Sequence, residues 1–312
     1  MIEPREYPEL DATRTLLLSD GCWINVVDPD SIQIETLQHK LGIPPIFIGH
    51  ALDIDELARI EKDGATTLIV LRIPHAQDAA ATVPYVTVPL GIILTNQHIV
   101  TVCKWNTDVV QDLDTSHTNE DMLANPERVV LQILLRTADQ YLAYVRTINI
   151  AVDVLEGRLQ YSLRNREVLE LLKYQKSLTH FTTALQMNEI MLERLQKDAL
   201  LMQHPEDAEL IADVLTEIRQ AITMASVASN ILSQMMDAFA SIISNNLNVV
   251  MKFLAVFTIV LTFPTMIASF YGMNVTLPGQ DAPLAFVVTL GVSLGVSLLA
   301  AVIFWKKDWP RG

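Results

Sequence analysis

Two long apolar runs without a charged residue lie near the carboxyl end of this chain. The first, Phe253 to Phe270, has eighteen residues, and the second, Leu284 to Trp305, has twenty-two. As α-helices they are about 27 and 33 Å long, which is enough to cross the hydrocarbon core of a bilayer. The pattern predicts two transmembrane helices over about 249–271 and 284–305, joined by an outer loop over 272–283.

A long helical region precedes these spans. From Arg158 to Tyr271 there is no glycine, and the only prolines are Pro205 and Pro264. Pro205 followed by two acidic residues is typical of a helix start, because proline lacks an N–H that would be unsatisfied there and acids suit the positive end of the helix dipole. One helix of about 65 residues, on the order of 100 Å, is predicted to run from there into the first span. Residues 119–248 are expected to form a helical stalk domain, with another helix beginning at Pro126.

The amino-terminal zone has a different pattern. Short runs rich in β-branched and other apolar residues indicate strands at 22–27, 67–73 and 91–94. Segments 90–94 and 98–103 flank a short polar turn and are predicted to pair as a hairpin. Between the first two strands, residues 52–57 are expected to open an amphipathic helix with acidic groups in its first turn. Residues 1–118 are therefore predicted to form an α/β domain.

Charge separates the two ends of the chain. The net charge is −14, and residues 245–312, with four basic and two acidic side chains, contribute +2, so residues 1–244 carry −16. Such an acidic domain repels nucleic acid and attracts cations, although acidic surplus in most proteins only improves solubility. The composition, 50% hydrophobic over 312 residues, supplies enough apolar material for two spans and a folded domain.

The flanks of the spans predict the topology. The first residues contain neither a basic stretch nor an apolar signal segment, so the large domain is expected to stay in the cytoplasm. Lys252 precedes the first span, Lys306 and Lys307 follow the second, and the loop between has no lysine or arginine. The positive-inside rule then places both termini in the cytoplasm, in a multi-pass protein of the cell (inner) membrane. Cys22 and Cys103 form no ligand or disulfide pattern, as expected in a reducing compartment.

Hydroxyl groups recur along one face of the first span. Thr258, Thr262, Thr265 and Ser269 follow one another at spacings of 4, 3 and 4, which places them on one side of a helix. The same face continues inward through Leu254 or Ala255, and then through Met251 and Asn248. Single hydroxyls in membrane helices usually bond to the backbone or join helices. Four on one face, between two asparagines, favour the lining of a water-filled pore.

The residues after this face carry a family resemblance. Tyr271-Gly272-Met273-Asn274 stands at the exit of the first span, and Ser244 to Lys252, Ser-Asn-Asn-Leu-Asn-Val-Val-Met-Lys, stands at its entrance. In a two-span chain behind a large soluble domain, this resembles the CorA magnesium channels. The resemblance implies a funnel-shaped homopentamer in which the first span of each subunit lines a central pore. It also implies that Asn248, Met251 and Leu254 form a polar ring and an apolar constriction, and that such a constriction can gate by dewetting.

The resemblance and ion chemistry assign Gly272, Met273 and Asn274 as the selectivity filter. Mg²⁺ releases its water reluctantly, so a channel does better to recognise the hydrated ion with neutral carbonyl oxygens than to strip it. Rings of Asn274 amides and of backbone carbonyls near Gly272 suit that task. A purely structural alternative is that Gly272 ends the helix in the left-handed conformation and Asn274 begins a turn.

Regulation by cytoplasmic Mg²⁺ bound between subunits is also implied by the resemblance. The residues that match by position are Asp78, after the second strand, and Asp213, on the stalk. No local motif supports either residue, and an ordinary solvated surface is the alternative.

The main hypothesis is a Mg²⁺ channel driven by membrane potential, with Co²⁺ and Ni²⁺ as further candidate ions and Mg²⁺ as both substrate and regulator. Its partners would be further copies of itself, the lipid bilayer and divalent cations, with no nucleic acid. A rival is the zinc-transporting branch of the same superfamily, which typically has Gly-Ile-Asn at the motif; the seven histidines form no paired metal motif here. A second rival is a membrane-anchored helical scaffold without transport. An enzyme is not predicted, because no nucleophile, base and orienting group come together in the sequence.

Overall fold

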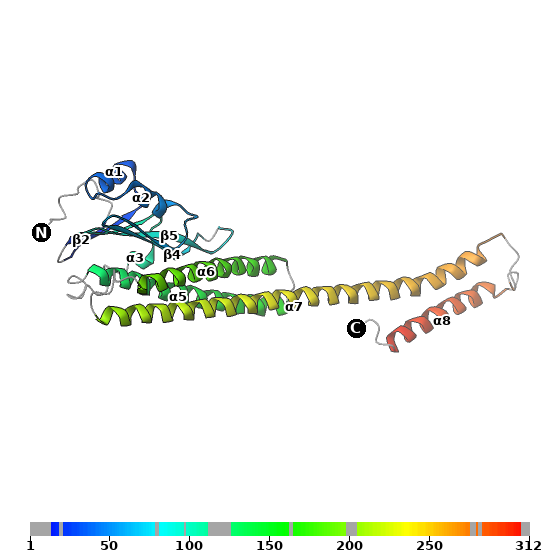
Figure 1. The fold of residues 1–312 in the computed structure, drawn as a ribbon. Coiled ribbons are helices and arrows are strands. Elements are labelled where there is room, and N and C mark those ends of the chain that lie inside the picture. Colours follow the sequence, from blue (N-terminus) through cyan, green and yellow to red (C-terminus); the bar gives the residue numbers. More distant parts are fainter. Residues whose placement is uncertain are drawn as a thin grey trace. The chain divides into compact units, whose positions relative to one another are not determined.

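The computed structural model describes residues 14–18, 21–78, 81–96, 98–111, 126–161, 165–197, 205–274, 279 and 283–306. The chain separates into two compact units, Met1–Gln234 and Met235–Gly312. The first unit contains a mixed sheet and several helices, and the second contains two apolar helical segments (Figure 1). The amino-terminal residues, most of the outer loop and the end of the chain from Lys307 onward lie outside the described residues.

A six-stranded sheet forms the centre of the α/β part. Its strands are β1 (Arg14–Leu18), β2 (Gly21–Val27), β3 (Arg59–Asp63), β4 (Thr66–Ala76), β5 (Tyr85–Leu94) and β6 (His98–Cys103), in the spatial order β1-β2-β6-β5-β4-β3. Among the strands that the structure describes, only β2 and β6 pair in parallel. The hairpin expected between 90–94 and 98–103 is confirmed, because β5 and β6 pair antiparallel with Leu94 opposite Ile99.

Helices α1 (Ser31–His39) and α2 (Pro45–Leu52) cover one face of the sheet (Figure 1). Asp30 begins α1 with a reciprocal cap, in which its carboxylate accepts from the Gln33 N–H at 2.8 Å and its own N–H donates to the Gln33 side chain at 3.0 Å. Helix α2 approaches β5 so closely that a Cβ on Gly91 would lie 2.4 Å from the Ala51 Cβ. Helix α2 and the sheet enclose a hydrophobic core that includes Phe47, which is fully buried.

The prediction of a helix over residues 52–57 is wrong. Leu52 is the last residue of α2, and Asp53 follows with extended backbone angles. The Asp53 carboxylate accepts the Asp55 N–H at 3.1 Å, and its carbonyl accepts the Glu56 N–H at 3.1 Å, so this segment forms a turn. Aspartate readily caps turns in this way. Ile54 and Leu57 stay exposed, and the segment therefore lacks the buried apolar side that stabilises an amphipathic helix.

Three helices pack in the first unit on the other side of the sheet from α1 and α2 (Figure 1). They are α5 (Pro126–Tyr161), α6 (Asn165–Lys197) and the start of α7 (Pro205–Tyr271), so both proline-marked helix starts are confirmed. Arg219 of α7 contacts Glu189 and Glu193 of α6, and Gln175 of α6 donates to Ser229 and Ser233 of α7. These pairings run in opposite directions along the two helices, which therefore lie antiparallel.

The predicted long helix is confirmed as well. Helix α7 continues for 67 residues, through Pro264, to Tyr271. After the outer loop, α8 (Ala285–Lys306) forms the second apolar segment. Both α7 and α8 are long and apolar enough to cross a membrane, and little or none of their apolar windows is buried within the chain. Exposed apolar surface over this length is what contact with lipid or with other membrane helices requires.

Candidate functional site

The end of α7 holds the Gly-Met-Asn motif in a regular backbone. The Gly272 N–H donates to the Ala268 carbonyl at 3.0 Å, and the Met273 N–H donates to the Phe270 carbonyl at 3.2 Å, so the helix ends by tightening into a final turn. Left-handed glycines occur in the described chain at Gly42, Gly64 and Gly279, and Gly272 is not among them. The interpretation of Gly272 as a left-handed cap is therefore wrong.

The small size of Gly272 keeps the end of the helix open. A Cβ at this position would lie 3.4 Å from the Ala268 carbonyl oxygen and 3.7 Å from that of Ser269. The glycine hydrogen leaves these oxygens more accessible than any side chain would. Met273 and Asn274 follow directly and are exposed, so the amide of Asn274 is available to a partner outside the chain. The loop acid Asp281 lies outside the described residues.

The hydroxyl groups of the first span are held in one pattern. Thr258 donates to the Leu254 carbonyl at 2.8 Å, Thr262 to the Thr258 carbonyl at 2.7 Å, and Thr265 to the Leu261 carbonyl at 2.9 Å. Each hydroxyl thus donates its hydrogen bond to a carbonyl of the preceding turn, as threonines in membrane helices usually do. Its oxygen retains lone pairs that can accept another hydrogen bond. Thr258, Thr262, Thr265 and Ser269 are all exposed within the single chain.

The inner part of the same face is apolar. Met251 is 56% exposed and Leu254 is 52% exposed, and Asn248, one turn before them, is exposed too. The rings of Phe253 and Phe257 stack on each other with centroids 6.3 Å apart. Helical periodicity places Phe253 away from this face, whereas Phe257, three residues after Leu254, borders it. This face of α7 therefore carries hydroxyl groups from Thr258 to Ser269 and apolar side chains at Met251 and Leu254.

The candidate regulatory acids lie apart from this helix segment. Asp78 follows β4, and Asp213 lies on the first part of α7; both are exposed. Burial lowers the pKa of His75, near Asp78, even though the carboxylates of Asp108 and Asp78 oppose that shift, so burial favours the neutral imidazole. Among the described residues of one chain, no group of three or more His, Cys, Asp or Glu is arranged to hold a metal ion.

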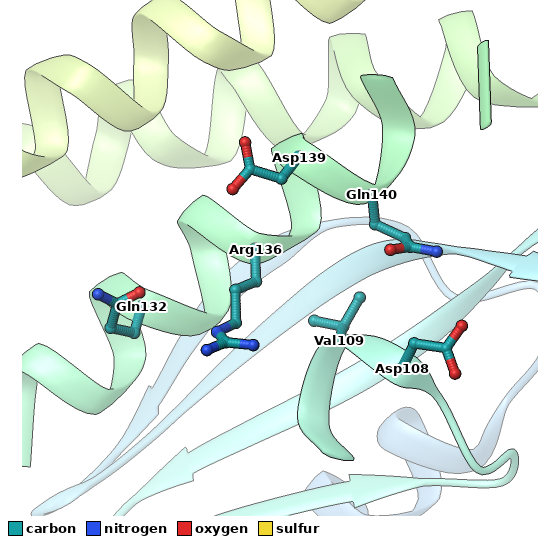
Figure 2. Close-up of a pocket in the computed structure, with 6 residues that line it drawn as sticks. All are labelled: Asp108, Val109, Gln132, Arg136, Asp139 and Gln140. Carbon is teal, nitrogen blue, oxygen red and sulfur yellow. The ribbon is translucent and has the colours of Figure 1, made fainter. Parts of the chain in front are cut away.

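A polar cavity of about 330 Å³ lies between α3 (Asp108–Gln111) and α5 (Figure 2). Its lining includes Asp108 and Val109 from α3 and Gln132, Arg136, Asp139 and Gln140 from α5. Figure 2 shows Arg136 and Gln140 extending toward α3, whereas the Asp139 carboxylate points away from it. The positive charge of Arg136 in this lining opposes cation binding there. None of the residues predicted from the sequence lines this cavity.

A family model described as CorA-like Mg2+ transporter protein matches residues 19–307 of the chain. The chain belongs to this family. The cobalt/magnesium transport protein CorA of Methanocaldococcus jannaschii is 26% identical over 298 residues, which cover 92% of this chain and 90% of the relative. The protein of the same name from Thermotoga maritima is 22% identical over 321 residues, covering 98% of this chain and 89% of the relative.

The fold agrees with this assignment. The complete structure of the CorA magnesium transporter from Methanocaldococcus jannaschii superposes with a TM-score of 0.81 at 23% identity, covering 93% of this chain and 92% of the other. The protein is thus a CorA-family membrane protein with an α/β domain, a long helix and two carboxyl-terminal transmembrane helices. CorA proteins are transporters and not enzymes, as the sequence predicted.

Sequence reasoning missed the residues that join the sheet to the helices. Asn188 and Tyr141, both fully buried, bond to the backbone of Arg72. They are separated from it by 116 and 69 positions. No local motif surrounds either residue. The one sequence signal for Asn188 is that it is a polar residue within an apolar helical pattern.

Proposed function

We propose that this CorA-family protein is a homopentameric channel that admits hydrated Mg²⁺ to the cytoplasm, with Co²⁺ and Ni²⁺ as further ions. The observation that carries the proposal is the combination of a Gly-Met-Asn motif at the exit of α7 with a hydroxyl-bearing face immediately before it. Relatives named as cobalt/magnesium transport proteins support the choice of ions.

Recognition of the hydrated ion follows from the chemistry of this face. The water molecules around Mg²⁺ direct their hydrogens outward, so a pore that leaves the ion hydrated needs acceptors. Asn274 supplies a neutral amide oxygen, and the threonines have already donated their protons to α7 itself. Their oxygens therefore face the pore as acceptors. Five subunits would repeat each acceptor as a ring.

The inner neck gives the proposed channel its gate. Rings of Met251 and Leu254 would enclose a narrow apolar passage, from which water withdraws because it loses hydrogen bonds there. Asn248 would form a polar ring on the cytoplasmic side. When the neck widens and wets, a divalent ion moving inward gains about 4.6 kcal/mol per 100 mV of membrane potential, so no ATP is required.

The same proposal includes the orientation and regulation of the channel. Both termini and the acidic domain would face the cytoplasm of a cell whose inner membrane holds α7 and α8. Cytoplasmic Mg²⁺ bound by Asp78 of one subunit and Asp213 of the next would favour the closed ring. The exposure of both carboxylates agrees with a site shared between subunits.

Ion flux into proteoliposomes at a set membrane potential tests the proposal. A fluorescent Mg²⁺ indicator should report uptake by the wild-type protein, whereas Zn²⁺ uptake with a weak Mg²⁺ response would favour the zinc-transporting branch. An absence of flux of either ion would favour a scaffold. Varying a proton gradient separates a passive channel from proton-coupled transport.

The variant Asn274→Ala should abolish selective Mg²⁺ uptake, because it removes the amide oxygen of the filter and leaves α7 intact. Asn230→Ala, at an exposed asparagine in the earlier part of the same helix, is the matched control and should keep wild-type flux. Size-exclusion chromatography checks that both variants assemble. Normal uptake by an assembled Asn274→Ala protein would remove Asn274 from the filter.

A further inference from the structure

A side chain forms the two hydrogen bonds to the Arg72 backbone that a neighbouring strand would otherwise form. Its N–H donates to the Asn188 Oδ1 at 3.0 Å, and its carbonyl accepts from the Asn188 Nδ2 at 2.7 Å. Strand β3 pairs with β4 only as far as Val70, which is opposite Arg59. The amide of Asn188, on α6, therefore occupies the place of a strand partner where β3 has ended.

Further contacts make residue 72 a junction of several elements. The Tyr141 hydroxyl, from α5, donates to the same Arg72 carbonyl at 3.0 Å. The Arg72 guanidinium donates to the carbonyls of Ile54 and Glu56 and to that of Thr87. One residue of β4 thus connects the turn after α2, the neighbouring strand β5 and both helices α5 and α6.

The next turn of α6 carries the connection to α7. Glu189, directly after Asn188, accepts from the Arg219 Nε at 2.6 Å, and Glu193 accepts from the Arg219 Nη2 at 2.6 Å. Two nitrogens of the same guanidinium group, Nε and Nη2, are engaged. Together they fix the orientation of Arg219 relative to α6 better than a single exposed ion pair does. A short stretch of α6 therefore connects to β4 through Asn188 and to α7 through Glu189 and Glu193.

The two candidate regulatory acids lie on the elements that this stretch connects. Asp78 follows the end of β4, and Asp213 precedes Arg219 on α7 by fewer than two helical turns. Helix α7 continues without a break from there to the pore-facing positions. A displacement of β4 would reach α7 through Asn188, because the buried amide cannot slip along the strand without leaving both of its hydrogen bonds unmade.

We infer that Asn188 is a positioning residue that couples the end of β4 to helix α7 and so transmits cytoplasmic Mg²⁺ binding to the pore helix. The inference rests on the proposed function. Asn188 contacts neither the proposed ion site nor the proposed pore. It fixes the position of β4 relative to α6. The contacts of Arg219 with Glu189 and Glu193 fix the position of α6 relative to α7.

The test compares Asn188→Ala with wild type in full-length proteoliposomes that contain a range of internal Mg²⁺ concentrations. We expect the concentration that halves Mg²⁺ uptake to rise roughly fivefold or more, the lower end of usual coupling between two sites. Thr137→Val is the matched control, because it removes a buried hydrogen bond, Thr137 to the Ile133 carbonyl, that stays within α5. It should keep the wild-type inhibition curve.

A second measurement separates coupling from loss of stability. Hydrogen exchange of the full-length protein should show that Mg²⁺ slows exchange both at the end of β4 and in residues 219–234 of α7, beyond the proposed ligand Asp213, in the wild type. In Asn188→Ala the effect at β4 should remain and the effect in α7 should disappear. Asn188→Asp, which keeps the size and the acceptor but loses the amide donor, gives the same comparison if the alanine variant does not fold.

The outcomes distinguish this inference from the proposed function. A wild-type channel that internal Mg²⁺ does not inhibit would overturn the proposed regulation, and the coupling with it. A wild type that is inhibited, together with Asn188 variants whose inhibition curve and α7 exchange equal those of wild type, would overturn the coupling alone.

Discussion

At the scale of single residues, the proposed function gives the threonines of α7 two tasks that are usually treated as alternatives. Thr262 donates its proton to the Thr258 carbonyl, so it satisfies the helix backbone as an ordinary membrane threonine does. Because the proton is used in this way, the hydroxyl oxygen can act only as an acceptor toward the proposed pore. The hydrogen bond to the backbone therefore leaves the hydroxyl only as an acceptor, which is what the water molecules around a hydrated cation require.

Replacing Thr262 by valine tests this reasoning. The substitution keeps the shape of the side chain and removes its oxygen, so Mg²⁺ uptake should fall roughly fivefold or more, which corresponds to about 1 kcal/mol, the usual net value of one hydrogen bond. Thr289→Val on α8 is the matched control, since Thr289 makes the same kind of bond to the Ala285 carbonyl at 2.8 Å. Equal flux in both variants would show that Thr262 serves only its own helix.

The sequence alone locates much of this site but not all of its geometry. The spacing of Thr258, Thr262, Thr265 and Ser269 is sufficient to place them on one face, because helical periodicity fixes direction. The backbone of Gly272 could not be inferred in the same way. Glycine is compatible with left-handed and right-handed conformations alike, and only its backbone φ, which is not positive, excludes the left-handed ending.

At the scale of elements, α7 joins a packed half in the first unit to an exposed half in the second. Its early residues, such as Ile211 and Ile218, are buried against the first unit, whereas Met251 and Leu254 are exposed. The same helix thus changes from a core element to one whose apolar side chains need partners outside the chain. The proposed neck lies soon after this change.

Met251→Ala and Leu254→Gly should each make the channel leakier. Smaller side chains widen the proposed apolar neck and favour its wetting, so Mg²⁺ flux at high internal Mg²⁺ should rise several-fold above the wild-type value, on the order of 1 kcal/mol in the closed state. Phe253→Ala removes a large apolar side chain from the other side of α7 and serves as the control. Unchanged flux and unchanged inhibition in both neck variants would argue against a gate at this position.

Elements with a clear periodic pattern were predictable, and short polar ones were not. Helix α7 follows from a glycine-free stretch with a proline at its start. Strand β3, Arg59–Asp63, consists mainly of charged residues at the edge of the sheet and gives no apolar alternation. The segment from Asp53 to Leu57 resembles a helix start because acids suit both a first helical turn and a capped turn, and only the surrounding packing decides between them.

At the scale of the whole molecule, charge and assembly are connected. Residues 1–244 carry a net charge of −16, so bringing five copies together concentrates negative charge in the proposed ring. A divalent ion between carboxylates of neighbouring subunits relieves that repulsion. Withdrawal of the ion should loosen the ring, because a bound ligand stabilises the state that binds it more tightly.

The double variant Asp78→Asn with Asp213→Asn should weaken inhibition by internal Mg²⁺. It should also reduce the protection from protease that we expect Mg²⁺ to give to the first unit, with a partial effect of roughly 1 kcal/mol, at the lower end of usual coupling free energies. Asp153→Asn with Asp237→Asn changes the charge by the same amount at two other exposed acids and is the control. An inhibition curve and a cleavage pattern identical to those of wild type would assign Asp78 and Asp213 to ordinary solvated surface.

The amide of Asn188 has one more consequence, for the behaviour of the protein among its neighbours. Strand β4 is longer than β3, so part of its outer edge would present bare N–H and carbonyl groups, and such edges invite strands from other chains to add on and aggregate. Asn188 occupies both groups of Arg72 at that place. The protein can therefore keep a short edge strand and still resist unwanted strand addition when many copies are crowded at a membrane surface.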